Sequence, residues 1–249
     1  MKTTKLYYQD SHLQSFSATV LSCEKADKYW EITLDATAFY PEGGGQACDL
    51  GTLGTARVLD VREQGEAVIH RCDAPLVVGE AVEGNIDYQR RFVLMQQHSG
   101  EHLVMGQIYQ KFGYHNVGFH MGSEVITIDF SGELDYATLR EIETAANAAV
   151  YRNIPCHIFY PDPDTLKTLR YRSKKEIDGQ VRLVEFPGVD ICACCAPHVG
   201  RTGEIGLIKL LDFIRYKGGV RIHLLCGDAA LVDYRLRYTQ SAEISAKLS

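Results

Sequence analysis

The first part of the chain alternates apolar and polar residues over short runs, which is typical of β-strands. Four such runs precede residue 88 and are rich in β-branched and aromatic side chains: SATVLSCE, YWEITLDA, ARVLDVRE and AVIHRCD. Gly, Asp and Pro residues separate the runs, and no helical period of useful length interrupts them. We therefore predict a small β-barrel domain over residues 1–87.

A helical period replaces this pattern at Tyr88. Apolar residues recur on one broad face as far as Phe112, and Gly113 is a suitable terminator. A second helical period spans residues 135–152. Strand-like composition returns in VGFHMGSEVITIDF, IPCHIFYP, RLVEFP, IGLIKLLDFI and GVRIHLLCG. Residues 88–230 are therefore predicted to form a domain of the α+β class.

The end of the chain is also helical in pattern, and residues 231–249 stop without a capping glycine or proline. Two interpretations are open: a linker helix that leads into a further C-terminal region, or a simple terminal helix.

Composition and charge narrow the class of protein. The chain has 249 residues, 45% hydrophobic and 23% charged, as in a globular protein of one large or two ordinary domains. The N-terminus lacks the apolar core of a signal peptide, and no run is long enough to span a membrane, so we expect a cytoplasmic protein. The net charge of −6 does not indicate nucleic-acid binding, but basic residues cluster at 90–91, 169–175 and 215–221. Each cluster is either a solvated face or a contact for phosphate.

The first candidate site is QQHSGEHLV, in the first predicted helix. His98 and His102 are four residues apart, about 40° from eclipsed at about 100° per residue, so both imidazoles face one point. With Glu101 they spell H-x-x-E-H, the inverted zinc-protease signature, in which the glutamate is the general base. A surface position is the alternative for Glu101.

A second cluster has the same spacing. In DICACCAPHVG, Cys194 and His198 are four residues apart. Together with the histidine pair they form a three-imidazole, one-thiolate set that suits zinc. Cys192 and Cys195 form a competing C-x-x-C, which could supply thiolates, act in redox chemistry or merely pack beside the ligands. Eight cysteines, three of them within four positions, favour metal binding over a disulfide framework.

The third motif, TAFYPEGGGQ, contains three consecutive glycines, which allow a backbone to approach a ligand closely or simply form a flexible loop. It lacks the G-K-[ST] of a phosphate-binding P-loop. TAFYPEGGGQ, QQHSGEHLVMG, VGFHMGSEVITIDF and CCAPHVGRTGEIG, in this order, resemble the AlaX family, the freestanding relatives of the alanyl-tRNA synthetase editing domain. The resemblance covers nearly the whole chain.

The resemblance implies an N-terminal barrel followed by a zinc-binding domain with the alanyl- and threonyl-tRNA synthetase editing fold. Its zinc ligands correspond to His98, His102, Cys194 and His198. Its glycine-rich motif corresponds to Thr37 with Gly43, Gly44, Gly45 and Gln46, near the amino-acid pocket. The interior Cys195-Ala196-Pro197 departs from the synthetase sequence C-G-G-T-H, so no role is carried over there.

The implied function is zinc-dependent hydrolysis of mischarged tRNA(Ala), chiefly Ser-tRNA(Ala), with Gly-tRNA(Ala) as a further substrate. Serine exceeds alanine by one hydroxyl, so selectivity needs polar groups that alanine leaves unpaired. Thr37, Gln46 and His120 are the candidates. The alternatives are a non-catalytic, zinc-stabilised tRNA-binding module and an H-x-x-E-H metallopeptidase. The starting methionine directly before the barrel favours a freestanding protein over part of a full synthetase.

Overall fold

The computed structural model describes residues 1–122, 125–173, 177 and 179–248, and its contacts divide the chain into two compact units. The first comprises Met1–Leu94 with Cys195–His198, and the second comprises Met95–Cys194 with Val199–Ser249. The division falls inside helix α1 (Tyr88–Phe112), whose start coincides with the predicted domain boundary. Both helices and sheets are present, as predicted.

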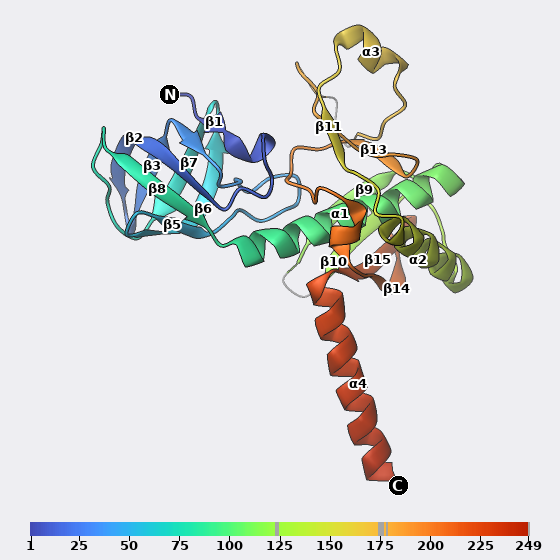
Figure 1. Ribbon diagram of the computed structural model, residues 1–249. Helices are drawn as coiled ribbons and strands as arrows, with labels where there is room; N and C mark the ends of the chain where they lie inside the picture. The colour runs from blue at the N-terminus through green and yellow to red at the C-terminus, as the bar shows by residue number, and fades with distance from the viewer. Residues whose placement is uncertain (123–124, 174–176, 178, 249) are drawn as a thin grey trace. The chain divides into compact units, whose positions relative to one another are not determined.

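Six strands of the first unit form a closed barrel in the order β2-β3-β7-β6-β5-β8 (Figure 1). Their bounds are β2 Ser15–Ala26, β3 Tyr29–Leu34, β5 Gly51–Leu53, β6 Ala56–Gln64, β7 Ala67–Cys72 and β8 Ala81–Ile86. Every neighbouring pair is antiparallel. Alternate residues point inward, as the sequence pattern predicts, and the core includes Ile32, Leu34, Val61 and Val68. A short parallel pair, β1 (Thr4–Lys5) and β4 (Ala36–Thr37), was not predicted.

The second unit contains two antiparallel sheets. The larger has the order β14-β15-β10-β9, and the smaller has the order β11-β12-β13. The bounds are β9 Asn116–Met121, β10 Ile126–Phe130, β11 His157–Phe159, β12 Leu183–Phe186, β13 Asp190–Ala193, β14 Ile208–Tyr216 and β15 Gly219–Cys226. Every strand predicted in this region is present, and β13 is an addition.

Helices complete the second unit. Helix α2 (Tyr136–Tyr151) is capped by Asp135, whose carboxylate accepts from the Thr138 backbone N–H, and it buries Leu139, Ile142 and Ala146 as its periodicity predicts. Gly113 adopts φ +70° directly after α1, which confirms it as the terminator. Helix α3 (Pro163–Thr168) is a short helix of six residues that follows β11.

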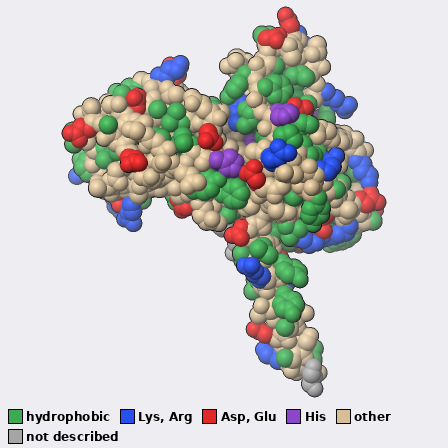
Figure 2. Space-filling model, in the orientation of Figure 1, with side chains coloured by type: hydrophobic (Ala, Val, Ile, Leu, Met, Phe, Trp, Pro, Cys, Tyr) green, Lys and Arg blue, Asp and Glu red, His purple; other side chains and the backbone are tan. Residues whose placement is uncertain are grey.

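The last helix, α4 (Asp228–Leu248), buries Ala230 and exposes most of its later residues. Its exposed apolar side chains include Val232, Tyr234, Leu236 and Tyr238 (Figure 2). In the part of the chain that the structure describes, no helix is both long and apolar enough to cross a membrane.

Candidate metal centre

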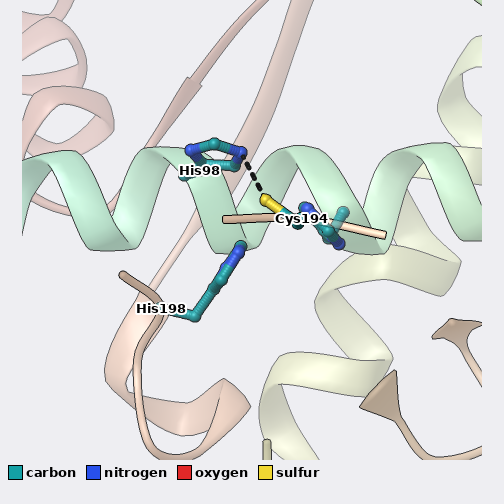
Figure 3. Close-up of side chains that lie close together, drawn as sticks. His98, Cys194 and His198 are labelled. Atoms are coloured by element: carbon teal, nitrogen blue, oxygen red, sulfur yellow. Dashed lines mark hydrogen bonds between the residues drawn. The ribbon is translucent and has the colours of Figure 1, made fainter. Parts of the chain in front are cut away.

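Helix α1 carries the two predicted histidine ligands on consecutive turns. The ring centroids of His98 and His102 are 5.5 Å apart, and both side chains are buried. Nε2 of His98 lies 3.6 Å from Sγ of Cys194, which follows strand β13 (Figure 3). The histidine spacing therefore produces the convergence that the sequence predicts.

The four predicted ligands come together. One ligand atom from each of His98, His102, Cys194 and His198 lies within 4.8 Å of all the others. Zn–N and Zn–S bonds of about 2.0 and 2.3 Å place neighbouring N and S ligands of a tetrahedral site about 3.5 Å apart, close to the His98–Cys194 distance. The donor types and their spacing therefore fit a zinc ion.

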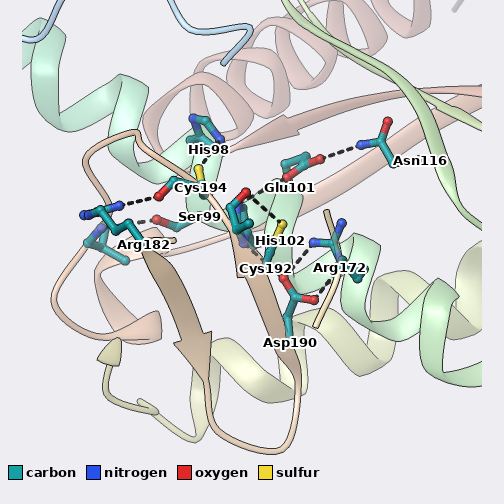
Figure 4. A network of polar contacts seen from close by, with 12 residues as sticks. His98, Ser99, Glu101, His102, Asn116, Arg172, Arg182, Asp190, Cys192 and Cys194 are labelled. Atoms are coloured by element: carbon teal, nitrogen blue, oxygen red, sulfur yellow. Dashed lines mark hydrogen bonds and ion pairs between the residues drawn. The ribbon is translucent and has the colours of Figure 1, made fainter. Parts of the chain in front are cut away.

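The ring of His102 has a second contact that sequence reasoning missed. Its Nδ1 lies 3.0 Å from Oδ2 of Asp190, at the start of β13 (Figure 4). Both Asp190 oxygens also accept from Arg172, from Nε and Nη2 at 2.7 Å each. All three side chains are buried. The available sequence signal was an aspartate four residues before a ligand cysteine, which is too common to be specific.

Asp190 is held in its ionised form. Burial by itself would raise the pKa of its carboxyl, but the Arg172 charge and the hydrogen bonds from His102 and Arg172 outweigh burial and lower that pKa. A buried carboxylate that accepts from a ligand imidazole is the usual outer partner of a protein-bound zinc ion.

Glu101 is buried, so the alternative of a surface position is wrong. Its side chain is on the same helix as the histidines, and it packs inward because α1 is covered on several sides. Its Oε1 accepts from Nδ2 of Asn116 at 3.1 Å, and its Oε2 lies 3.9 Å from Nε2 of His102. A carboxylate beside the ligand face of His102 is suitably placed to handle a proton there.

Two glycines allow α1 to approach its neighbours closely. A Cβ at Gly100 would stand 2.4 Å from Sγ of Cys226 on β15. A Cβ at Gly106 would stand 2.3 Å from the Val189 carbonyl oxygen and 2.8 Å from Cβ of Asp190. Gly106 follows His102 by one helical turn, so it permits the contact between His102 and Asp190.

The two cysteines of the C-x-x-C have different surroundings. Cys192 is buried, and its Sγ lies within 4.8 Å of ligand atoms of His102 and Asp190. Cys195 is exposed, and its Sγ lies 3.5 Å from the Tyr40 hydroxyl. None of the eight cysteines is in a disulfide.

The predicted amino-acid-binding residues Thr37, Gly43, Gly44, Gly45 and Gln46 all lie in the first unit. The glycines form a tight turn in which Gly43 and Gln46 exchange backbone hydrogen bonds of 3.1 and 2.9 Å. Gly44 and Gly45 adopt φ values of +60° and +86°, which side chains disfavour. The turn therefore favours glycine at positions 44 and 45.

Thr37 is buried and bonded to a histidine that sequence reasoning did not select. The Ile32 carbonyl can only accept, so Nδ1 of His70 carries the proton in their 3.1 Å contact. Nε2 of His70 then accepts from the Thr37 hydroxyl at 2.8 Å, and Thr37 in turn accepts from the Phe39 backbone N–H at 3.1 Å.

His70 predicts a pH dependence for the barrel. Burial lowers its pKa from the usual 6.5 to about 4. Above pH 6.5 it is neutral in both states, whereas between 6.5 and 4 the unfolded chain binds a proton that the folded barrel excludes. The free energy of unfolding should therefore fall with decreasing pH, by about 3 kcal/mol in all from this residue. Urea unfolding at pH 7, 6 and 5 measures this effect: the free energy of unfolding should decline less with falling pH in His70→Gln than in wild type. Equal declines in the two proteins would show that His70 is not the residue responsible.

His120 is exposed on β9. Its neighbour Phe119 packs against the ring of His98, with centroids 5.1 Å apart. Successive side chains of a strand point to opposite faces, so His120 points away from the face that meets His98.

Two predicted basic clusters contain arginines that are buried in the protein. Arg172 is bonded to Asp190, and Arg91 is fully buried against Asp49. Neither guanidinium is exposed for a phosphate. Arg170 is exposed and lies over the Tyr109 ring, 5.3 Å from its centroid. Lys174 and Lys175 lie outside the described residues.

Two family models match parts of the chain. The model described as threonyl and alanyl tRNA synthetase second additional domain matches residues 181–223, which include Cys194 and His198. The model described as tRNA synthetases class II (A) matches residues 2–90, which include the glycine turn.

Curated relatives match over most of the chain. Over 94% of its own length, the chain is 36% identical to an alanine–tRNA ligase of Halobacterium salinarum. Over 99% of its own length, it is 31% identical to the alanine–tRNA ligase of Ignicoccus hospitalis. It is 32% identical over 82% of its length to the alanyl-tRNA editing protein Aarsd1 of Danio rerio. The chain spans 27% and 28% of the two ligases, respectively, and 53% of the editing protein.

Proposed function

Because the chain belongs to the AlaX-like family of alanyl-tRNA editing domains, we propose that it is a zinc-dependent deacylase that hydrolyses the aminoacyl ester of mischarged tRNA(Ala). The observation that carries this proposal is the convergence of His98, His102, Cys194 and His198 beside the buried Glu101. Ser-tRNA(Ala) is the proposed main substrate, and Gly-tRNA(Ala) is a further one.

The chain's own residues have separate tasks in this reaction. His98, His102, Cys194 and His198 would hold zinc, which when bound polarises a carbonyl oxygen or lowers the pKa of water. Asn116 fixes one oxygen of Glu101 and leaves Oε2 facing His102. We assign to this oxygen the removal of a proton from the attacking water. An ester is already activated toward attack by water. Placement of the water and stabilisation of the charge that develops on the carbonyl oxygen therefore suffice for its hydrolysis.

The ligand set argues against the peptidase alternative. Peptidases with H-x-x-E-H recruit a carboxylate as a further metal ligand. Here the ligand group includes the thiol of Cys194. A thiolate donates more charge than a carboxylate and weakens zinc as a Lewis acid.

Hydrolysis of Ser-, Gly- and Ala-tRNA(Ala) by the purified protein tests the proposal. We expect release of serine and glycine well above the rate of release of alanine. Tight tRNA binding without release of any amino acid would support the non-catalytic alternative. Peptide cleavage that is lost in Glu101→Gln would support the peptidase alternative.

Selectivity for serine is assigned to polar groups at Thr37 and Gln46, and His120, which points away from the face that meets His98, is left out of this assignment. The Thr37 hydroxyl donates to His70 and accepts one bond from Phe39, so it retains a lone pair for a substrate hydroxyl. Thr37→Val should narrow the ratio of Ser- to Ala-tRNA(Ala) hydrolysis, while Thr37→Ser, which keeps the hydroxyl, should preserve it. An unchanged ratio in Thr37→Val would remove Thr37 from the pocket.

Arg170 is the proposed phosphate contact of the second unit. It lines a cavity of about 280 Å³ together with Tyr109, Gln110, Arg172, Gly188, Val189, Asp190 and Ile191. Arg172 neutralises Asp190 there, so the exposed Arg170 leaves the cavity with a positive charge. The aromatic ring and the cation suit a nucleotide.

Arg170→Ala is therefore expected to weaken tRNA binding several-fold and to reduce the salt slope of log K by about one. Fluorescence anisotropy at several salt concentrations measures both. Arg152→Ala, which removes an exposed arginine at the end of α2, is the matched control. Equal salt slopes for wild type and Arg170→Ala would show that Arg170 faces solvent in the complex.

A further inference from the structure

The contact between His102 and Asp190 has a consequence for the metal centre itself. We propose that Asp190 and Arg172 are a positioning pair that fixes the tautomer and ring orientation of His102, and thereby determines the affinity and geometry of the metal site. This inference rests on the four-ligand site of the proposed function, and it adds two residues that are not among the four predicted ligands.

The tautomer follows from the chemistry of the partner. An ionised carboxylate can only accept, so the 3.0 Å contact requires Nδ1 of His102 to carry its proton. The lone pair of the neutral ring is then on Nε2, which leaves that atom available to coordinate a metal. Without the Asp190 carboxylate, the hydrogen bond that selects this tautomer would be lost. The carboxylate therefore selects the one state that can coordinate a metal through Nε2.

Arg172 in turn fixes the carboxylate. It donates to both oxygens, which prevents rotation of the carboxylate about its terminal bond. Its backbone is also fixed against β13, because its N–H donates to Ile191 O at 2.8 Å and its carbonyl accepts from Ala193 N–H at 2.9 Å. These main-chain hydrogen bonds hold the backbone of Arg172 at a fixed position beside the strand that carries Asp190.

The backbone of α1 completes the arrangement. Gly106 allows the Val189–Asp190 segment to lie directly against the helix, one turn beyond His102. Any side chain at this position would have to displace that segment. The distance between Nδ1 and Oδ2 therefore depends on the absence of a Cβ at residue 106.

His102, Asp190 and Cys192 also have ligand atoms within 4.8 Å of one another, so these three residues could be taken for a second metal site. Arg172 excludes that interpretation. Its guanidinium bonds both carboxylate oxygens and adds a positive charge where a cation would have to sit. The geometry therefore assigns Asp190 to orient a ligand and not to be one.

The test uses metal binding, which does not depend on tRNA. In Asp190→Asn we expect zinc affinity, measured by competition with a chromophoric chelator, to fall by about 10- to 100-fold. We also expect the visible absorption bands of the Co²⁺-loaded protein to change, since they report ligand geometry. Asp190→Glu, which keeps the charge, should recover part of the affinity. Gly106→Ala removes no polar group and should alter the same two readouts.

Asp129→Asn is the matched control. Asp129 is also a largely buried carboxylate of the second unit, and it accepts from Nε and Nη2 of Arg221 at 2.6 and 2.8 Å. It contacts no ligand histidine in the described structure. Its replacement should lower stability and leave zinc affinity and the Co²⁺ spectrum unchanged.

Wild-type affinity and spectrum in a folded Asp190→Asn would overturn the proposal, as would an equal loss in Asp129→Asn. If Asp190→Asn fails to fold, Gly106→Ala decides by the same two readouts. A wild-type protein that binds zinc but does not release serine would refute the proposed function and leave this inference standing.

Discussion

Replacing His102 with alanine should remove both the metal and the activity. The substitution deletes one of four converging ligands and leaves the Asp190 carboxylate without the imidazole it orients. Three remaining ligands bind zinc less tightly, and the deacylation rate should fall by more than the roughly 10- to 100-fold that loss of an outer partner costs.

Metal content by mass spectrometry and hydrolysis of Ser-tRNA(Ala) measure the two effects together. His157→Ala is the control, since His157 is an exposed histidine of the second unit on β11, and its replacement should change neither. Full metal content and full activity in His102→Ala would refute the ligand assignment.

Replacing Arg91 with alanine should destabilise the first unit by about 3–5 kcal/mol, because it leaves the Asp49 carboxylate buried without its counter-charge. Both side chains are almost wholly buried, at 0% and 1% exposed. Arg91 also donates to the carbonyl oxygens of Ser11 and Ala38, and Asp49 accepts from the Tyr40 backbone N–H. The pair thus fixes the backbone that leads into the glycine turn.

Urea unfolding of Arg91→Ala measures this loss. Arg57→Ala breaks an exposed pair with Asp73 in the same unit and should cost no more than about 1 kcal/mol. Replacing both partners, as in Arg91→Met with Asp49→Asn, should cost less than Arg91→Ala alone, because no charge remains unpaired and the amide oxygen can still accept from the Tyr40 N–H. A loss in Arg91→Ala equal to that in Arg57→Ala would contradict the account.

Local periodicity predicted the elements of this fold well. The alternating runs before residue 88 became barrel strands, and the 3.6-residue period of 135–152 became α2 with Asp135 as its cap. The four residues that converge at the candidate metal centre were predicted from two identical four-residue spacings. Each of these features depends on residues close together in the sequence.

The remaining features depend on contacts that no local pattern contains. Asp190 meets His102 across 88 residues, and Arg91 meets Asp49 across 42. A basic cluster in the sequence does not show whether its arginines pair with a carboxylate inside the fold. Arg91 and Arg172 were therefore counted among the possible phosphate contacts, although each pairs with a buried aspartate. The burial of Glu101 was not predicted, because α1 is covered on more sides than its apolar stripe indicates.

Release of free serine from Ser-tRNA(Ala) tests the central claim most directly. The wild-type protein loaded with one equivalent of zinc should release serine far faster than the uncatalysed ester hydrolyses, and removal of zinc by a chelator should abolish the difference. A zinc-loaded, folded protein that leaves Ser-tRNA(Ala) intact at the uncatalysed rate would contradict the account.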